Sequence, residues 1–281
     1  MFSNEYRWDE VSENAVSDWY LPGQGEKYPT CGKVYYQGCL QTQYHLFPID
    51  PSQRGKAYIK KVKNNCGRAQ CPECNKKWMV EATKNIEHRI EEGKPSQYRR
   101  AIHVTISPPA SEWSIFEGKG EYPKMRRKAT RLAKKAGLIG FVMIPHAYRQ
   151  NSSSKLWRFS PHFHLLGYGW VVYTKMIYEK TGWIIKNHRI RKSVGATAYY
   201  QISHAGVKEG YHVISWCGCL AWNKIKVSRL KKERQVCPLC GAPTLKVIYY
   251  GRGSHPLEGS PNGEYYLDSD EWRYTSRFRY I

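Results

Sequence analysis

The stretch SPHFHLLGYG, residues 160–169, places two histidines one residue apart in an otherwise apolar run. His162 and His164 flank Phe163, and two leucines follow. Alternate side chains of a β-strand project from the same face, so these imidazoles would lie roughly 7 Å apart on one face of a sheet. Such a pair can converge on one metal ion. An isolated pair is more often two core histidines bonded to the backbone, so the surrounding sequence decides its meaning.

The chain around this pair alternates strand-like and helix-like stretches. YRRAIHVTISPP predicts a strand over 99–107, with His103 and Thr105 on one face and a proline pair as its end. Residues 76–92 predict a helix because apolar side chains recur at every fourth position. Other expected elements are a helix over 124–135, a helix within 193–206, strands over 137–149 and around the histidine pair, and a last strand over 245–251.

Composition points to a polyanionic partner. The 281 residues carry a formal net charge of +22 and include 22 Tyr and 10 Trp. A chain this basic is typical of nucleic-acid binding, although a general adaptation of solubility would also raise the charge. The first 30 residues carry a net negative charge instead, with six acidic side chains against two basic ones. The binding surface is therefore expected downstream of an acidic arm.

The sequence also indicates a compartment. It contains no run of 18 apolar residues and begins with an acidic stretch rather than an apolar one, so neither a membrane span nor a secretory signal is expected. The nine cysteines have spacings typical of metal sites. These features predict a protein of a reducing, cytoplasmic environment.

Two cysteine units predict structural zinc. CPLCG at 237–241 is a zinc knuckle in which Cys237 and Cys240 flank two residues, and Cys217 and Cys219 precede it. Four thiolates at this spacing suit one tetrahedral zinc ion, so these four are predicted to bind it together.

CPEC, which holds Cys71 and Cys74, is the matching half of a first zinc site, with Cys66 close by. The remaining ligand has to come from Cys39, Cys31 or His45, which gives more candidates than places. We predict Cys39, Cys66, Cys71 and Cys74 as the ligands, with Cys31 as the alternative.

Other residues fall in the order and spacing of one known family. HFH fits the pattern of His, a bulky hydrophobic residue and His that gives the HUH endonucleases their name. AIHVTISPP resembles the first strand of that family, and ATAYYQISHAG resembles the helix that carries its nucleophilic tyrosine. Over roughly residues 97–210 the chain resembles these enzymes, and in particular the rolling-circle replication initiators of archaeal plasmids and viruses. CGRAQCPEC is similar to a zinc segment that such initiators often carry.

The resemblance implies a catalytic metal site. A third ligand would come from the strand next to the histidine pair, which nominates His146 beside His162 and His164. The ion would be Mg²⁺ or Mn²⁺, as the family implies, although the softness of three imidazoles alone favours a later transition metal.

The resemblance also implies a nucleophile. Tyr200 and His204 are four residues apart and share a helical face, whereas Tyr199 points about 100° away. Tyr200 is therefore predicted to attack DNA and become linked to its 5′ phosphate, with Tyr199 as the alternative. Most members of the family have a lysine after the tyrosine, and His204 is the matching polar residue here. His204 would position the phosphate, relay the proton or ligate the metal.

The implied architecture is α+β: a central antiparallel β-sheet with flanking helices, a palm of the HUH and RRM kind, plus zinc-binding modules. Along the chain we expect an acidic N-terminal arm (1–30), a Cys-rich zinc-binding segment with a helix (31–95), the endonuclease core (96–215), a zinc ribbon-like insertion (216–245), and a last strand with a C-terminal tail (246–281).

The implied function is site-specific nicking and joining of single-stranded DNA through a 5′-phosphotyrosine intermediate, which starts rolling-circle replication of a plasmid or virus. A single-tyrosine transposase shares this site and is an alternative. A zinc-dependent nucleic-acid-binding protein without catalysis would also explain the charge and the aromatic residues. The sequence has no GxxxxGK[ST] phosphate loop, so a host helicase and polymerase would act with it at a single-stranded origin.

Overall fold

The structure is a computed structural model, and the residues that it describes are 18–117, 120–151, 157–228, 230 and 235–275. The chain divides into two compact units. Unit 1 comprises residues 1–27 and 67–230, and unit 2 comprises residues 28–66 and 231–281. The segments expected from the sequence are consecutive, whereas unit 2 combines two segments that are far apart along the chain.

Unit 1 is built on a five-stranded sheet in the order β7-β4-β6-β5-β9. Its strands are β4 (Ile102–Ser107), β5 (Leu138–Gln150), β6 (Trp157–Gly169), β7 (Ile184–Ile190) and β9 (Ser215–Gly218). All four pairings are antiparallel. The long strand β6, which contains the HFH stretch, lies at the centre between β4 and β5. A second, two-stranded sheet pairs β1 (Trp19–Tyr20) with β8 (Val207–Lys208).

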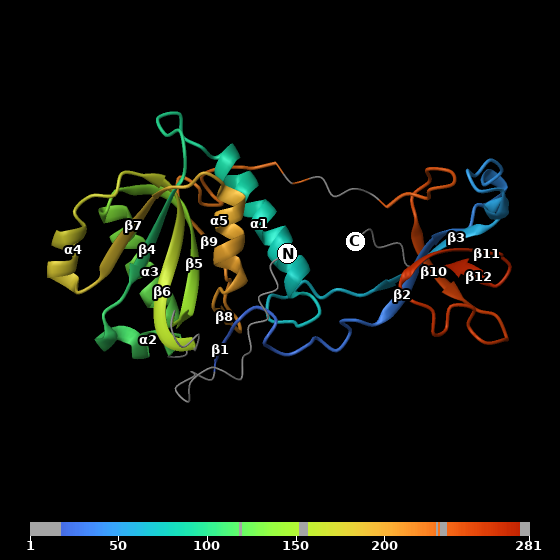
Figure 1. Cartoon of the computed structure of the whole chain (residues 1–281), viewed down its shortest axis with the longest axis horizontal. Coiled ribbons are helices and arrows are strands. Elements are labelled where there is room, and N and C mark those ends of the chain that lie inside the picture. Colours follow the sequence, from blue (N-terminus) through green and yellow to red (C-terminus); the bar gives the residue numbers. More distant parts are fainter. Residues whose placement is uncertain (1–17, 118–119, 152–156, 229, 231–234, 276–281) are drawn as a thin grey trace. The chain divides into compact units, whose positions relative to one another are not determined.

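Helices cover both faces of the five-stranded sheet. The helices are α1 (Asn75–Glu92), α2 (Trp113–Glu117), α3 (Tyr122–Lys135), α4 (Thr174–Thr181) and α5 (Val194–Ser203). Figure 1 shows α1 and α5 side by side next to the sheet. They pack on one face through a cluster that includes Ile86, Ile90, Ala198, Ile202, Val142, Ile144 and Leu166. The opposite face packs on α2 and α3 through Phe116, Met125, Ala129, Phe141, Met143, Phe163 and Leu165. Residues of β5 and β6 thus alternate between two cores, as the period of a strand requires.

Local sequence explains the two helices that matter most for the site. On α1, Ala82, Ile86 and Ile90 recur every four residues and are buried, and Gly93 ends the helix by donating its N–H to the carbonyl of Arg89. On α5, the hydroxyl of Ser193 accepts a hydrogen bond from the N–H of Ala196 and caps the first turn.

Unit 2 contains a five-stranded antiparallel sheet in the order β11-β3-β2-β10-β12. Its strands are β2 (Val34–Cys39), β3 (Ala57–Lys63), β10 (Leu245–Tyr249), β11 (Gly263–Leu267) and β12 (Trp272–Tyr274). The pairing of β10 with β2 joins the two distant segments. A small core holds the sheet together, formed by Ala57, Ile59, Val247, Leu257 and Trp272.

The expected helices over 76–92 and 124–135 and within 193–206 are confirmed, and so are the strands over 99–107 and 137–149, around the histidine pair, and over 245–251. The fold is mixed α+β with antiparallel sheets, as predicted. Most of unit 2 was not expected: β2, β3, β11 and β12 lie in stretches without a clear alternation of apolar and polar residues.

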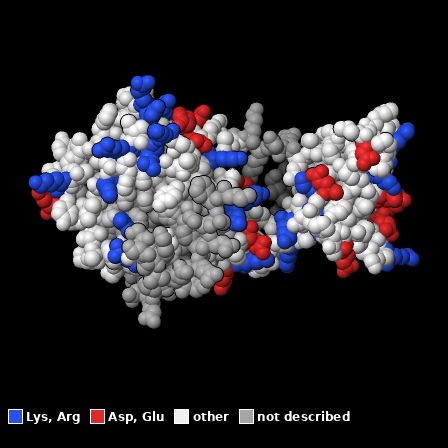
Figure 2. Space-filling model, viewed as in Figure 1, with Lys and Arg blue, Asp and Glu red and all other residues white. Residues whose placement is uncertain are grey.

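Both units are basic to a similar degree. Unit 1 has 31 Lys and Arg residues against 16 Asp and Glu, and unit 2 has 14 against 7. On the visible face of unit 1 in Figure 2, Lys and Arg side chains are spread widely with few acidic ones among them. In the part of the chain that the structure describes, no helix has the length and the apolar character that crossing a membrane requires.

Candidate active site and metal centres

Three histidines meet on the face of the unit 1 sheet that α5 covers. His162 and His164 alternate with Phe163 on β6, and His146 on β5 stands directly opposite His162 in the strand register. The ligand nitrogens of the three all lie within 4.8 Å of one another. The Nε2 atoms of His162 and His164 are 3.1 Å apart. The structure thus brings together the three residues that were predicted to hold the catalytic ion.

Each of these imidazoles is held through one ring nitrogen. His162 donates from Nδ1 to the carbonyl of Ser160 at 2.7 Å, and the ring of His146 bonds to the backbone of Gln201. His164 Nδ1 lies 2.7 Å from Nε2 of His103. The second nitrogen of each ring lies close to those of the other two histidines, and those of His162 and His164 contact each other. An ion among the three would replace that contact. His146 Nε2 is buried and has no hydrogen-bond partner among the described residues, which is the condition expected of a ligand atom.

Burial keeps the three rings neutral. It holds the pKa of His146 and His164 well below the ordinary value, and neighbouring histidines lower both further. Burial, followed by the charge of Arg149, lowers the pKa of His162 to about 3. A neutral imidazole has the lone pair that a metal needs, so no proton has to leave before an ion binds near pH 7.

A bulge in β5 brings the guanidinium group of Arg149 beside the histidines. The register between β5 and β6 shifts between His146 and Tyr148, so Tyr148 packs into the core on the α2–α3 side instead of sharing the face of His146. The following residue, Arg149, then returns to the histidine face. Its Nε lies 3.4 Å from Nδ1 of His162, and its Nη2 donates to the hydroxyl of Ser107 at 2.9 Å. The Ser160 contact, at 2.7 Å, is the shorter of the two contacts of that Nδ1, and a carbonyl oxygen can only accept. The ring proton of His162 therefore lies on Nδ1 and is donated to Ser160.

Helix α5 places the predicted nucleophile and His204. The rings of Tyr200 and His204 are 4.6 Å apart in an edge-to-face arrangement, and His204 lies 4.8 Å from the ring of His146. The chain is fixed there because Gly206 donates its N–H to the carbonyl of Pro145. A Cβ at Gly206 would lie 2.9 Å from the Trp19 ring, so this close approach requires glycine.

Tyr200 and the three histidines line one cavity of about 750 Å³. Tyr200 is 62% exposed, so its ring is open to solvent, and Tyr199 is not among the lining residues. Cationic groups come from Arg149 and Lys186, and none of the described residues that line the cavity is Asp or Glu. Such a cavity suits an anionic substrate.

Two histidines of the site were not predicted to have a role. His103 on β4 is buried and bonds to His164, and His188 on β7 stacks on His103 with ring centroids 4.5 Å apart. Thr105 also bonds to His188, at 2.8 Å. The alternation of His103 with Thr105 on one strand face was visible in the sequence. The position of His188 depends on the pairing of β7 with β4, which no local sequence pattern predicts.

In unit 2, a Cys₃His group can hold a metal ion: Cys39, His45, Cys237 and Cys240. Nε2 of His45 lies 3.3 Å from Sγ of Cys240 and 3.4 Å from Sγ of Cys237. Its Nδ1 donates to the carbonyl of Lys56 at 2.7 Å, which leaves Nε2 for an ion. Three sulfurs and one imidazole nitrogen are compatible with structural zinc.

This group corrects the predicted one, in which Cys217 and Cys219 completed the site of Cys237 and Cys240. Cys217 and Cys219 belong to unit 1, at the end of β9, where Gly218 has a φ of 64°. Cys217 packs with the core on the α2–α3 side of the sheet and Cys219 with the core on the α1–α5 side. Sulfurs on opposite faces of a sheet cannot share one ion.

The other cysteine group consists of Cys31, Cys66, Cys71 and Cys74. It is compatible with a Cys₄ zinc site, and Cys74 directly precedes the first turn of α1. Cys31, the alternative ligand, therefore takes the place predicted for Cys39. The reason is β2, which begins three residues after Cys31 and ends at Cys39: its two ends are roughly 17 Å apart, too far for both cysteines to reach one ion.

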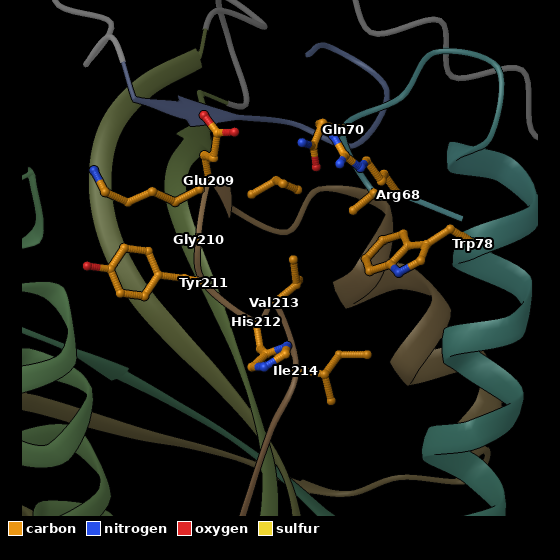
Figure 3. A pocket seen from close by; sticks show the side chains of 12 residues that line it. Arg68, Gln70, Trp78, Glu209, Gly210, Tyr211, His212, Val213 and Ile214 are labelled. Carbon is orange, nitrogen blue, oxygen red and sulfur yellow. The ribbon is translucent and has the colours of Figure 1, made fainter. Parts of the chain in front are cut away.

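Unit 1 has a second cavity of about 370 Å³, and it shares no lining residue with the histidine cavity. Trp78 projects toward it from α1, beside Arg68 and Gln70, and the segment 207–214 forms the other wall (Figure 3). None of the predicted site residues lines it, and no metal-ligating group among the described residues faces it.

Comparison with protein-family models, with curated proteins and with solved structures finds no match to this chain. What the protein does is therefore inferred from its own side chains.

Proposed function

We propose that this protein is a metal-dependent endonuclease that nicks and rejoins single-stranded DNA through Tyr200, and that it thereby starts rolling-circle replication of a plasmid or virus. The observation that carries the proposal is that Tyr200 and the His146–His162–His164 group line the same cavity.

The donor set fits a divalent cation. The group offers three neutral imidazoles, a buried orphan nitrogen on His146, and Nε2 atoms on His162 and His164 at a spacing that one ion can bridge. An ion held by these three ligands would have coordination positions left for a phosphate oxygen and water. When bound, Mg²⁺ or Mn²⁺ would polarise a non-bridging oxygen of the phosphodiester and offset the charge that develops during attack.

The protein's own side chains would do the rest. The phenol oxygen of Tyr200 attacks phosphorus, the bond from phosphorus to the 3′ oxygen of the preceding nucleotide breaks, and a 5′-phosphotyrosine and a free 3′ hydroxyl result. Attack by a 3′ hydroxyl on the phosphotyrosine reverses these bond changes and rejoins the strand. Arg149 would contact the phosphate, and the half-buried Trp113, which also lines the cavity, would stack on a base.

His204 stands where the phenol proton could be received. Burial lowers its pKa to about 4, so it is neutral near pH 7 but a weak base, and transfer of the proton would also need a bound cation to acidify the phenol. It stands beside the ring of Tyr200 and holds its Nδ1 against the hydroxyl of Ser203 at 3.1 Å. Because it is neutral, it would not substitute for a positively charged lysine as a phosphate ligand.

The wider protein supports the proposal. The HUH resemblance implies a central antiparallel sheet with flanking helices, and unit 1 has an antiparallel sheet with helices packed on it. The net positive charge suits a polyanionic partner. The two cysteine groups would stabilise the fold through zinc.

The test uses a pool of fluorescently labelled single-stranded oligonucleotides with a randomised centre, because the target sequence is to be found. Full-length protein is incubated with the pool and Mn²⁺, denatured in detergent and resolved by electrophoresis. We expect a protein–DNA species that survives denaturant, disappears on protease treatment and fails to form with EDTA. Sequencing the captured strands then gives the preferred site.

DNA that is retained on a filter by native protein but never found in a denaturant-stable species would contradict the proposal. That result would favour a zinc-dependent nucleic-acid-binding protein without catalysis.

A further inference from the structure

The histidine cluster extends beyond the three candidate ligands. Across the sheet, His188 on β7, His103 on β4 and His164 on β6 form a row, with ring centroids 4.5 Å apart for the first pair and 5.0 Å apart for the second. His103 is buried and is not among the residues that line the cavity, so it is connected to the cavity through His164.

The bond between His103 and His164 has a directional consequence. It joins Nε2 of His103 to Nδ1 of His164 at 2.7 Å, and one of these nitrogens must donate while the other accepts. A neutral His164 has one ring proton. If Nε2 of His164 is to face an ion together with His146 and His162, that proton has to lie on Nδ1, and Nε2 of His103 has to be the acceptor.

The alternative arrangement is incompatible with an ion. If His103 donated from Nε2, His164 would carry its proton on Nε2, the atom that lies 3.1 Å from Nε2 of His162. A protonated Nε2 has no lone pair to offer. The nitrogen of His103 thus decides whether His164 is a ligand.

The rest of the environment holds His103 in place for this task. Its ring stacks within 20° of parallel on His188, and its Nδ1 is buried without a hydrogen-bond partner among the described residues. Burying an unpaired polar atom costs free energy that an apolar side chain would avoid. A histidine at this core position is therefore better explained by its contact with His164 than by packing alone.

We propose that His103 is a positioning residue: it accepts the Nδ1 proton of His164 and so turns Nε2 of His164 into a metal ligand. This inference rests on the proposed function, because it assumes that the three histidines bind a divalent cation.

The test measures Mn²⁺ binding by electron paramagnetic resonance for the full-length protein and four variants, one of which, His162→Ala, removes a candidate ligand. His103→Leu fills the same space without an acceptor, and its dissociation constant for Mn²⁺ should rise on the order of 10- to 100-fold, the range typical when a ligand loses such a partner. In His103→Gln the side-chain carbonyl can accept the same proton, and affinity should return close to the wild-type value. His212→Leu removes an exposed histidine outside the site and should bind like wild type.

A second measurement does not depend on the variants folding. In ¹⁵N-labelled wild-type protein loaded with diamagnetic Mg²⁺, the side-chain nitrogens should show a proton on Nδ1 of His164 and an unprotonated, hydrogen-bonded Nε2 on His103. A protonated Nε2 on His103 in that state would overturn the inference.

The outcomes separate the two proposals. Wild-type protein that binds Mn²⁺, with His103→Leu binding it equally well, would overturn the role of His103 and leave the proposed function standing. Wild-type protein whose Mn²⁺ binding is absent, or unaffected by His162→Ala, would overturn both.

Discussion

His45 and Cys237 are 192 residues apart in the sequence, yet Nε2 of His45 lies 3.4 Å from Sγ of Cys237. The pairing of β10 with β2 produces this contact, because it brings the knuckle of Cys237 and Cys240 to the end of β2 at Cys39. A metal at this point would fasten the two chain segments of unit 2 to each other.

The first prediction follows from that ligand group. Purified protein should contain two equivalents of zinc, and Cys237→Ser should contain one, because three remaining ligands hold the ion poorly. The variant should also unfold at a lower temperature, since unit 2 has only a small apolar core. Elemental analysis by mass spectrometry and circular dichroism measure the two effects. Cys219→Ser is the matched control and should keep both equivalents; zinc loss there would restore the ligand set predicted from spacing.

These residues also show how far the sequence alone reaches. The shared face of His162 and His164, and that of Tyr200 and His204, could be predicted because each depends on the local period of one strand or one helix. The correct partners of Cys237 could not, because both cysteine units carry a CxxC knuckle and the spacing does not say which strands will pair. The choice between Cys31 and Cys39 likewise required the length of β2. His146 was nominated by family resemblance, since no local pattern links it to β6.

The second prediction concerns acid. In the unfolded chain the site histidines take up protons near pH 6.5, but in the folded protein His162 does so only at about 3 and His204 at about 4. Between these values the unfolded state binds more protons, so the free energy of unfolding must fall as the pH drops below 6.5. Each buried histidine would contribute up to about 1.4 kcal/mol per pH unit.

Denaturant unfolding of protein without a cation at the histidines, followed by tryptophan fluorescence from pH 7.5 to 5, measures this loss. The variant with His146, His162 and His164 all replaced by Gln should depend less steeply on pH, while any contribution from the cysteine groups stays the same. Equal slopes for the two proteins would show that these histidines are not held neutral by the fold.

The third prediction concerns the nucleophile. Tyr200→Phe should bind single-stranded DNA as wild type does but form no denaturant-stable adduct, because it lacks the phenol oxygen that we propose as the attacking atom. Tyr199→Phe is the matched control one residue away: its ring is exposed but does not line the cavity, and its adduct yield should be unchanged. Filter binding and denaturing electrophoresis on the same oligonucleotides separate binding from reaction. The reverse pattern, with Tyr199→Phe inactive, would move the nucleophile to Tyr199.

The last prediction concerns Arg149, which the bulge in β5 directs to the histidine face. Its guanidinium bonds to Ser107 and lies next to His162, and no described ion pair involves it, so a phosphate would be its first anionic partner. Arg149→Gln should lower the cleavage rate at saturating DNA by roughly 100-fold, a loss typical when one donor to a developing oxyanion is removed. It should also reduce the slope of log affinity against log salt by about 0.7, the value for one phosphate contact on a single strand.

Arg158→Gln is the matched control. Arg158 stands opposite Arg149 on β6 but does not line the cavity, so the cleavage rate of this variant at saturating DNA should stay at the wild-type value. Equal losses in the two variants would mean that general positive charge, rather than a placed guanidinium, serves the reaction.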